Sequence, residues 1–384
     1  MATHGEKKRK PERSRDSSIS LFASVLLLLL VGVVMVFDAS VVTSVNTFGG
    51  KYHSLLLQAA WVLVGIIGML ISLKLDQVFL KKISFFLLFF SIICLFLVIL
   101  PTPFSPKIYG ARRWLFLNPP PLPLLPFIGR LGFQPSELVK LSLIFYAAFW
   151  LPGREKLSEI ITYLGLVFLI CGLVIIQPDF GTSLVIASIG FGMFFILKED
   201  LRLFFAVIPF IFLIALGFIL ISPYRKSRLE TYLNPEEADA LTTGYHVNQI
   251  MIAVGSGGIF GLGPGESRQK YSYLPEVTTD SIFAILCEEF GFVGGFFVVF
   301  LFVFIIFRLL KGVLAGEKFS DKAIISGVAL WISAQTILNL SAMMGVVPLT
   351  GVPLPLISYG GSSLVLTMFA LGAAIRALSA PKYV

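Results

Sequence analysis

A series of long apolar runs repeats along almost the whole chain and constrains its fold more than any other feature. The runs lie at residues 19–43, 53–73, 83–100, 137–151, 158–176, 180–197, 203–222, 281–307, 324–346 and 356–378. A helix needs about 20 apolar residues to cross the hydrocarbon of a bilayer, and most runs approach that length. With 57% hydrophobic and only 14% charged residues, an ordinary water-soluble domain is excluded. We predict an all-α integral membrane protein with about ten transmembrane helices.

The distribution of basic residues predicts the orientation. Ten crossings place both termini on one side of the membrane, and loops rich in Lys and Arg face the cytoplasm. Basic residues gather in residues 1–18, in alternate short loops such as 74–82 and 308–322, and near the C-terminus. We therefore predict cytoplasmic termini, a basic tail at 1–18 and a single polytopic domain at 19–384. The first run is too long for a cleaved signal peptide.

Charge, cysteine and glycine patterns exclude several other classes. The net charge of +8 is concentrated in the tail and cytoplasmic loops, so we expect anionic membrane lipids as its partner and not nucleic acid. Cys94, Cys171 and Cys287 lie inside predicted spans, which argues against a disulfide framework. The glycine-rich runs lack the Lys-Ser or Lys-Thr pair of a phosphate-binding loop, so we predict no nucleotide site.

Two extracytoplasmic loops, at 101–136 and 223–280, are too long to be simple turns. Proline recurs in the first, which predicts an irregular or re-entrant strip, because each proline removes a backbone donor. The second has nearly balanced charge, a helix-like stretch at 247–254, and seven glycines between Gly244 and Gly265. So much glycine is costly unless close approach or positive φ angles are required. We predict a structured loop that holds a ligand or a partner.

Ionisable residues in or beside apolar spans are costly and usually face a cavity or a partner. Glu137 and Lys140 are three residues apart, so they share a helix face and form either an internal salt bridge or part of a substrate site. Lys140 is also suited to hold a phosphate as a point charge. Asp179 precedes a span, and there we predict a helix cap.

A cluster of acidic residues surrounds the start of the run at 281–307. Asp280, with Glu276 before it, fits either a helix cap or a general base beside an anionic substrate. Glu288 and Glu289 lie deeper, and successive helical residues diverge by about 100°, so we expect them to need different partners. For this pair we predict structural ion pairs, with a proton or ion path as the alternative.

Seven stretches, read in order, resemble the SEDS family (shape, elongation, division and sporulation) of peptidoglycan glycosyltransferases. They are GARRW, QPSELVKL, QPDFGTS, PYRKSRL, the long segment GYHVNQIMIAVGSGGIFGLGPGESRQKYSYLPEVTTDSIFA, EEFGFVGG and GVVPLTGVPLPLISYGGSS, from residue 110 to 363. GARRW and SRQKYSYLPE are more similar to the division-type branch, FtsW, than to the elongation-type branch, RodA. Thr278 and Ser281 stand where the family usually has histidine and phenylalanine.

The resemblance implies polymerisation of lipid II into glycan strands at the outer face of the bacterial cytoplasmic membrane. It places the catalytic base on Asp280, with Glu276 and Thr279 of the same motif beside the substrate. The departing undecaprenyl pyrophosphate is anionic, so cations or a divalent metal such as Mg or Mn should stabilise it. The substrate-binding candidates are Lys140, Glu137 as its orienting partner, Trp114, Arg112, Arg113, and Ser358 and Ser362 opposite Asp280.

The resemblance also implies a class B penicillin-binding protein as partner, together with other proteins of the division or elongation machinery. Three alternatives remain at this point. One is an elongation-type polymerase, another is a lipid II flippase or proton-coupled carrier, and the last is a scaffold without catalysis. A carrier should show inverted repeats and acidic residues at mid-membrane. The sequence shows one acidic pair at moderate depth and no repeat between its halves.

Overall fold

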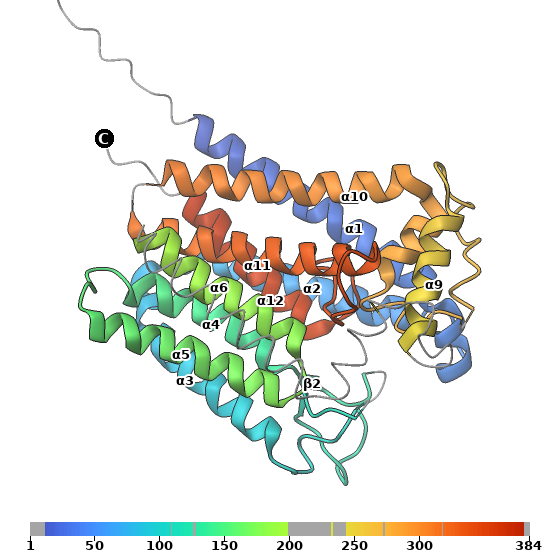
Figure 1. The fold of residues 1–384 in the computed structure, drawn as a ribbon, viewed down its shortest axis with the longest axis horizontal. Helices are drawn as coiled ribbons and strands as arrows, with labels where there is room; N and C mark the ends of the chain where they lie inside the picture. The colour runs from blue at the N-terminus through green and yellow to red at the C-terminus, as the bar shows by residue number, and fades with distance from the viewer. Residues whose placement is uncertain are drawn as a thin grey trace, which may run out of the picture.

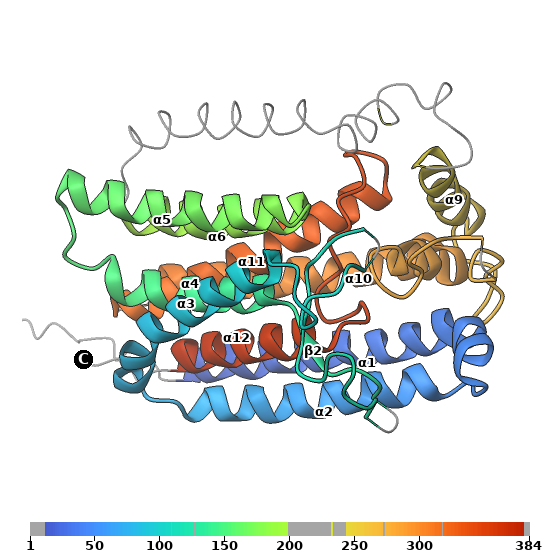
Figure 2. The same cartoon turned by 90° about the horizontal axis from the view of Figure 1, so that it is seen from below.

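The computed structural model describes residues 12–108, 110–125, 128–198, 232, 243–271, 273–316 and 318–379. These residues form a bundle of long helices that run side by side (Figures 1 and 2). The helices are α1 (Glu12–Phe48), α2 (His53–Lys74), α3 (Gln77–Ile99), α4 (Pro135–Trp150), α5 (Leu157–Ile176), α6 (Phe180–Lys198), α9 (Thr243–Ser256), α10 (Ile282–Ala315), α11 (Phe319–Met343) and α12 (Gly361–Ser379). The all-α prediction is confirmed, with two short strands as the exception.

Eight of these helices are long and apolar enough to cross a membrane. They are α1, α2, α3, α5, α6, α10, α11 and α12, and they match eight of the ten predicted runs. The fourth run forms α4, which has 16 residues and packs against α3, α6, α11 and α12. The seventh run, 203–222, lies outside the described residues. The prediction of an integral membrane protein is confirmed.

Burial differs sharply between the helices and shows which of them form the core. In the most apolar part of α11, 67% of the residues are buried within the protein, against 22% in α2. The buried residues of α11 include Trp331, Gln335 and Asn339, whereas α2 presents Leu63 and Ile67 at its surface. An apolar face that no other helix covers is suited to lipid. Polar side chains on α11 therefore lie inside the bundle, where they need protein partners.

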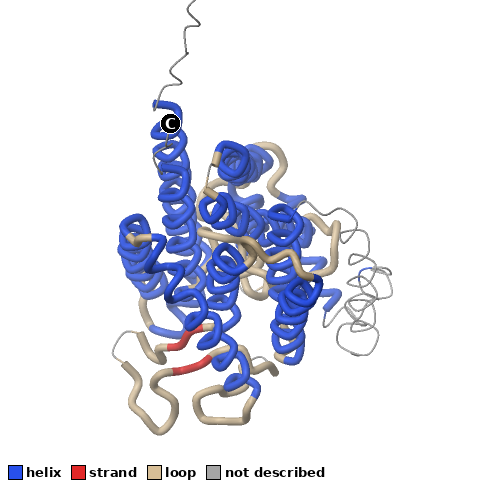
Figure 3. The backbone as a smooth tube through the Cα atoms, turned by 90° about the vertical axis from the view of Figure 1, so that its left-hand side faces the viewer, coloured by secondary structure: helices blue, strands red, loops and turns tan. Residues whose placement is uncertain are grey.

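The segment between α3 and α4 is irregular, as its prolines predict. Strand β1 (Leu115–Phe116) pairs antiparallel with β2 (Gly132–Phe133), with Leu115 opposite Phe133. Figure 3, which looks along the bundle, shows the two strands at its margin. The Asn118 side chain closes the segment, since its Nδ2 donates to Pro123 O at 3.2 Å and to Gly129 O at 3.1 Å.

The described part of the second long loop is structured, as predicted. Helix α9 covers the predicted stretch 247–254, and the glycine-rich residues 257–270 follow it without regular secondary structure. This loop lies at the end of the bundle where α10 begins (Figure 1). The start of α4 lies next to the start of α12, since Gln134 N–H donates to Ser362 Oγ at 3.4 Å. The loop thus lies over the end of the bundle that carries the candidate site.

Candidate active site

Asp280 lies in a tight turn immediately before α10. The N-cap residue of α10 is Ser281, which makes no side-chain capping bond, so Asp280 does not occupy the capping position. The backbone N–H groups of Thr279 and Ser281 donate to Glu276 O at 3.1 and 3.2 Å, and Glu276 has a positive φ of 52°. Thr279 Oγ1 lies 2.8 Å from Glu276 Oε2 and 3.3 Å from Asp280 Oδ1. The turn therefore brings both carboxylates to one threonine hydroxyl.

The loop between α11 and α12 packs directly on this turn. Ser358 Oγ donates to Thr279 O at 2.5 Å, and Tyr359 N–H donates to Thr278 O at 2.8 Å. A Cβ atom at Gly351 would lie 3.8 Å from Asp280 Oδ2, so the loop backbone passes close to the carboxylate. Burial raises the pKa of the Tyr359 phenol above its usual value. Ser358 and Asp280 thus lie on two segments in direct contact.

Two amide side chains on one face of α11 donate hydrogen bonds to these segments, and neither residue was predicted from the sequence. Asn339 Nδ2 donates to Asp280 O and to Val352 O, each at 2.8 Å. One turn away, Gln335 Nε2 donates to Pro353 O at 2.8 Å. Polar amides four residues apart in an apolar span are the signal that would have identified them.

Gln335 also connects the site to the Glu137–Lys140 pair. Lys140 Nζ donates to Glu137 Oε1 at 2.7 Å and to Gln335 Oε1 at 3.0 Å. It lies 4.7 Å from the centroid of the Trp331 ring, in a cation–π contact. Lys140 is only 1% exposed. The predicted internal salt bridge is therefore present, and Lys140 is enclosed by protein groups.

The residues at the start of β1 bond to the neighbouring interhelical segments. Arg113 Nε donates to Gln177 O at 3.3 Å, and its guanidinium also bonds to Pro178 O. The Arg112 guanidinium bonds to Ser105 O. Trp114 and both arginines are half-buried. A guanidinium has five donors, so these cations retain capacity for a further anion.

Asp179 and Ser362 join α4, α6 and α12 at the same end of the bundle. Asp179 Oδ1 accepts from Thr182 N–H at 3.2 Å, which confirms the predicted cap of α6. Its Oδ2 accepts from Gln134 Nε2 at 3.1 Å. Ser362 Oγ accepts from Gln134 N–H at 3.4 Å, so Ser362 contacts the start of α4.

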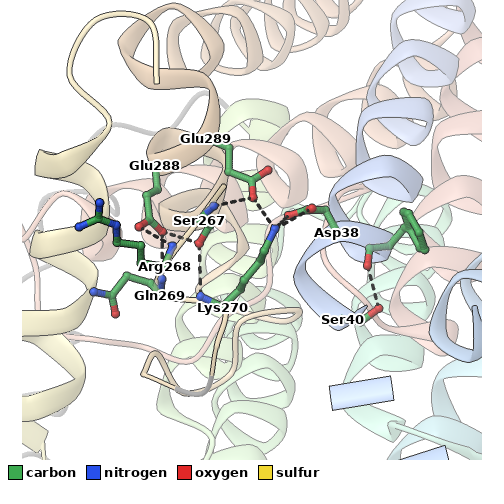
Figure 4. A network of polar contacts seen from close by, with 9 residues as sticks. Asp38, Ser40, Ser267, Arg268, Gln269, Lys270, Glu288 and Glu289 are labelled. Atoms are coloured by element: carbon green, nitrogen blue, oxygen red, sulfur yellow. Dashed lines mark hydrogen bonds and ion pairs between the residues drawn. The ribbon is translucent and has the colours of Figure 1, made fainter. Parts of the chain in front are cut away.

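Glu288 and Glu289 bind the turn at 267–270, as Figure 4 shows. Ser267 Oγ donates to Glu288 Oε2 at 2.5 Å, while Ser267 N–H donates to Glu289 Oε1 at 3.2 Å. The expectation of different partners is confirmed apart from Ser267, which both carboxylates share. Glu288 also accepts from the N–H groups of Arg268 and Gln269, whereas Glu289 accepts from Lys270 Nζ. The predicted ion pair is present at 2.8 Å between Glu289 and Lys270.

Two further observations bear on the chemistry of the site. His246 Nε2 lies 2.9 Å from Oγ of Ser281, one of the two residues at which the resemblance to the family motif is broken.

Among the described residues, no group of three or more His, Cys, Asp or Glu side chains could hold a metal ion. A cation at this site would therefore depend on ligands from a substrate, as Mg²⁺ often does with phosphates.

The fold and the site define a class of protein: a polytopic membrane protein whose polar, carboxylate-bearing site lies at one end of the helical bundle. The sequence pattern of the cell cycle protein family FtsW/RodA/SpoVE matches residues 19–382. The chain belongs to this family.

Relatives and solved structures agree with that assignment. The chain is 32% identical to a probable peptidoglycan glycosyltransferase FtsW of Trichlorobacter lovleyi, over 95% of this chain and 93% of the relative. It is 33% identical to stage V sporulation protein E of Bacillus subtilis, over 97% and 99%. A chain of a solved peptidoglycan synthase complex superposes with a TM-score of 0.74 at 26% identity, covering 94% and 96%. RodA of Thermus thermophilus superposes with a TM-score of 0.62 at 26% identity, covering 94% and 95%.

Proposed function

We propose that this protein is a division-type peptidoglycan glycosyltransferase that polymerises lipid II, with Asp280 as the general base. The observation that carries the proposal is the placement of Asp280. Its half-buried carboxylate shares Thr279 with Glu276, and its backbone carbonyl is fixed by Asn339. A general base must be held in position while keeping an open face toward the reacting hydroxyl. The family and the relatives named peptidoglycan glycosyltransferase supply the class of reaction.

The proposed reaction transfers a glycan from a lipid pyrophosphate to a sugar hydroxyl. Asp280 removes the proton of the acceptor hydroxyl as the oxygen attacks the anomeric carbon of the donor. The bond from that carbon to the pyrophosphate oxygen breaks, and undecaprenyl pyrophosphate leaves with the electron pair. Arg112 and Arg113 are half-buried cations at this end and are suited to stabilise its negative charge.

Glu137, Lys140, Trp114, Ser358 and Ser362 remain proposed substrate-site residues. The contacts of Ser358 support a role in shaping the site, since it fixes the carbonyl next to Asp280. Lys140 is sealed by Glu137, Gln335 and Trp331, so a phosphate would reach it only by displacing a partner. A role in holding the interior of the site is better supported for Lys140 than direct phosphate contact.

A divalent cation, Mg or Mn, remains part of the proposal only as an ion carried by the substrate. Asp280 and Glu276 are the carboxylates joined by Thr279, and substrate phosphate oxygens would supply the other ligands. Such an ion would offset the charge of the leaving pyrophosphate. The roles derived above for Asp280, Arg112 and Arg113 do not depend on it.

The proposed location is the bacterial cytoplasmic membrane, with the site on the extracytoplasmic side. Lys74, Lys198 and Arg376 lie in the last turns of α2, α6 and α12, at the opposite end of the bundle from Asp280. Basic residues favour the cytoplasmic side, which leaves Asp280 outside. The proposed partner is a class B penicillin-binding protein, supported by the likeness to a solved complex described as coordinating polymerization and crosslinking.

The test is polymerisation of purified lipid II by the full chain with its partner. We expect Asp280→Asn to abolish glycan product, while Glu155→Gln, an exposed carboxylate at the opposite end, retains wild-type activity. Equal product from Asp280→Asn and wild type would refute the assignment of the base. Transport of lipid II in proteoliposomes tests the flippase alternative. Rescue of septation would indicate the division-type polymerase, and rescue of rod elongation would indicate the elongation type.

A further inference from the structure

Helix α10 is interrupted about three turns after Asp280, at Gly291, and residues of the glycine-rich loop bond to the backbone there. Gly291 has φ 64° and ψ −162°, so the helical hydrogen bonds across it are lost. Four backbone groups of α10 beside Gly291 therefore need other partners. All four partners lie within residues 258–263. The bonds are Leu262 N–H to Glu288 O at 3.0 Å, Gly263 N–H to Glu289 O at 3.0 Å, Phe292 N–H to Gly258 O at 2.9 Å and Val293 N–H to Ile259 O at 3.1 Å. The loop is therefore joined to α10 through its backbone.

Glycine is required at this junction because the two backbones touch. A Cβ atom at Gly257 would lie 1.9 Å from Cys287 O, and one at Gly261 would lie 2.0 Å from Glu289 O. A Cβ atom at Gly291 would lie 2.3 Å from Gly261 N. Contacts that short are impossible, so any larger residue would push the loop away from α10.

Lys270 follows the residues that bond to α10 and links this loop to a second helix, α1. Its ammonium lies 2.8 Å from Glu289 Oε1 on α10 and 2.9 Å from Asp38 Oδ1 on α1 (Figure 4). The Lys270 and Glu289 side chains are 4% and 1% exposed. Burial alone lowers the pKa of Lys270, but its bonds to Glu289 and Asp38 outweigh that effect and raise it above the usual value. Lys270 therefore remains charged at neutral pH and is not free to bind an anionic substrate.

Two separate backbone turns lie between Lys270 and Asp280. Leu274 N–H donates to Gln269 O at 3.0 Å, and the turn closed by Glu276 follows. The segment 273–281, which we call the catalytic arch, thus lies between the turn that ends at Lys270 and the start of α10. An arch with one anchor removed has more conformations open to it, and Asp280 shares that freedom.

We propose that Lys270 is a positioning residue for the reaction, acting through Asp38 and Glu289 to hold the catalytic arch between α1 and α10. This proposal rests on the proposed function of Asp280. Lys270 itself touches no reacting atom, and its effect is on the geometry of the base. Because misplacement of a catalytic group by about 1 Å can cost about 100-fold in rate, loss of the clamp should lower kcat more than it raises KM.

The test compares the full chain with its partner in wild-type and variant forms. Lys270→Met removes the charge and keeps the length, and Lys270→Arg restores the charge. Asp38→Asn is the milder variant, since the Asp38 side chain is 19% exposed and Lys270 keeps Glu289. Lys311→Met, the same substitution at an exposed position of α10, is the matched control. The readouts are kcat and KM for lipid II and amide hydrogen exchange of residues 273–281.

A merely structural role makes a different prediction for the double variant Lys270→Met/Glu289→Gln. The double variant leaves no unpaired charge at Glu289, which is 1% exposed, and Asp38, at 19% exposed, keeps access to water. Folding should therefore be restored, while the link to Asp38 stays broken. We expect thermal stability near wild type, with kcat still about 10- to 100-fold low, KM within about 3-fold and faster exchange in 273–281. Recovery of wild-type kcat, or unchanged exchange in that segment, would overturn the proposal.

Asp38→Asn settles the question if the Lys270 variants do not fold. We expect a smaller kcat loss than for Lys270→Met, with faster exchange at 273–281 and a folded protein. Wild-type kcat and exchange in Asp38→Asn would also overturn the proposal. The exchange readout does not depend on catalysis. An active Asp280→Asn variant would refute the proposed function, whereas the role of Lys270 in holding residues 273–281 would still be judged from their hydrogen exchange.

Discussion

The amide of Asn339 offers the sharpest test of how the site is held. Its Nδ2 donates 2.8 Å bonds to Asp280 O and Val352 O, and the residue is 1% exposed. Asn339→Leu keeps the approximate shape but leaves two carbonyls without their donor. Each orphaned group costs about 1–3 kcal/mol, which bounds the loss at about 2–6 kcal/mol. Hydrogen bonds between membrane helices average only about 0.6 kcal/mol, so we expect a value near the lower bound, about 2 kcal/mol.

The matched control for Asn339→Leu is Thr336→Val on the same helix. Thr336 is 3% exposed, and its hydroxyl has no hydrogen-bond partner among the described residues. Replacing it with valine orphans nothing, so its stability should equal or exceed that of wild type. Thermal unfolding of the purified chain measures stability, and polymerisation at a temperature where both variants are folded measures kcat. Asn339→Leu should lose both; equal unfolding temperatures and equal kcat for the two variants would refute the reasoning.

Two further predictions concern the glycine junction and the buried ion pair. Gly261→Ala places a Cβ atom against Glu289 O at a position with φ +82°, so we expect loss of folded protein in size-exclusion profiles, whereas Gly255→Ala, with open space around it, should behave as wild type. Glu137→Gln leaves Lys140 as a buried cation without its counter-charge and should cost about 3–5 kcal/mol, seen as a lower unfolding temperature. The double variant Glu137→Gln/Lys140→Met should recover much of that loss, and a double variant less stable than the single one would contradict the prediction.

The sequence predicted the features that depend on local pattern. Apolar length located eight membrane helices, and the start of α10 fell beside Asp280 because a polar loop meets an apolar run there. The cap at Asp179 followed from its position just before an apolar run, and the Glu137–Lys140 pair followed from a spacing of three residues. In each case the interacting atoms belong to one turn of chain, so no knowledge of the tertiary fold was needed.

Features that depend on distant contacts escaped prediction. The partner of Lys140 on α11, Gln335, lies 195 residues away along the chain. The interruption at Gly291 lies within a run that reads as uninterrupted apolar helix, and only the bonds from residues 258–263 make it stable. Because of those bonds, Glu288 and Glu289 face one turn, which helix geometry alone did not indicate.

The division of charge around the site limits how an anionic substrate can be held. Lys140 and Lys270 are buried lysines near the site. Each forms an ion pair with one or two carboxylates at 2.7–2.9 Å. Among the described residues, Arg112 and Arg113 bond instead to backbone carbonyls, which carry no compensating charge. A cation without a counter-charge attracts phosphate more strongly than one already paired. The buried lysines thus stabilise the protein around Asp280, while the arginines are the groups suited to the pyrophosphate.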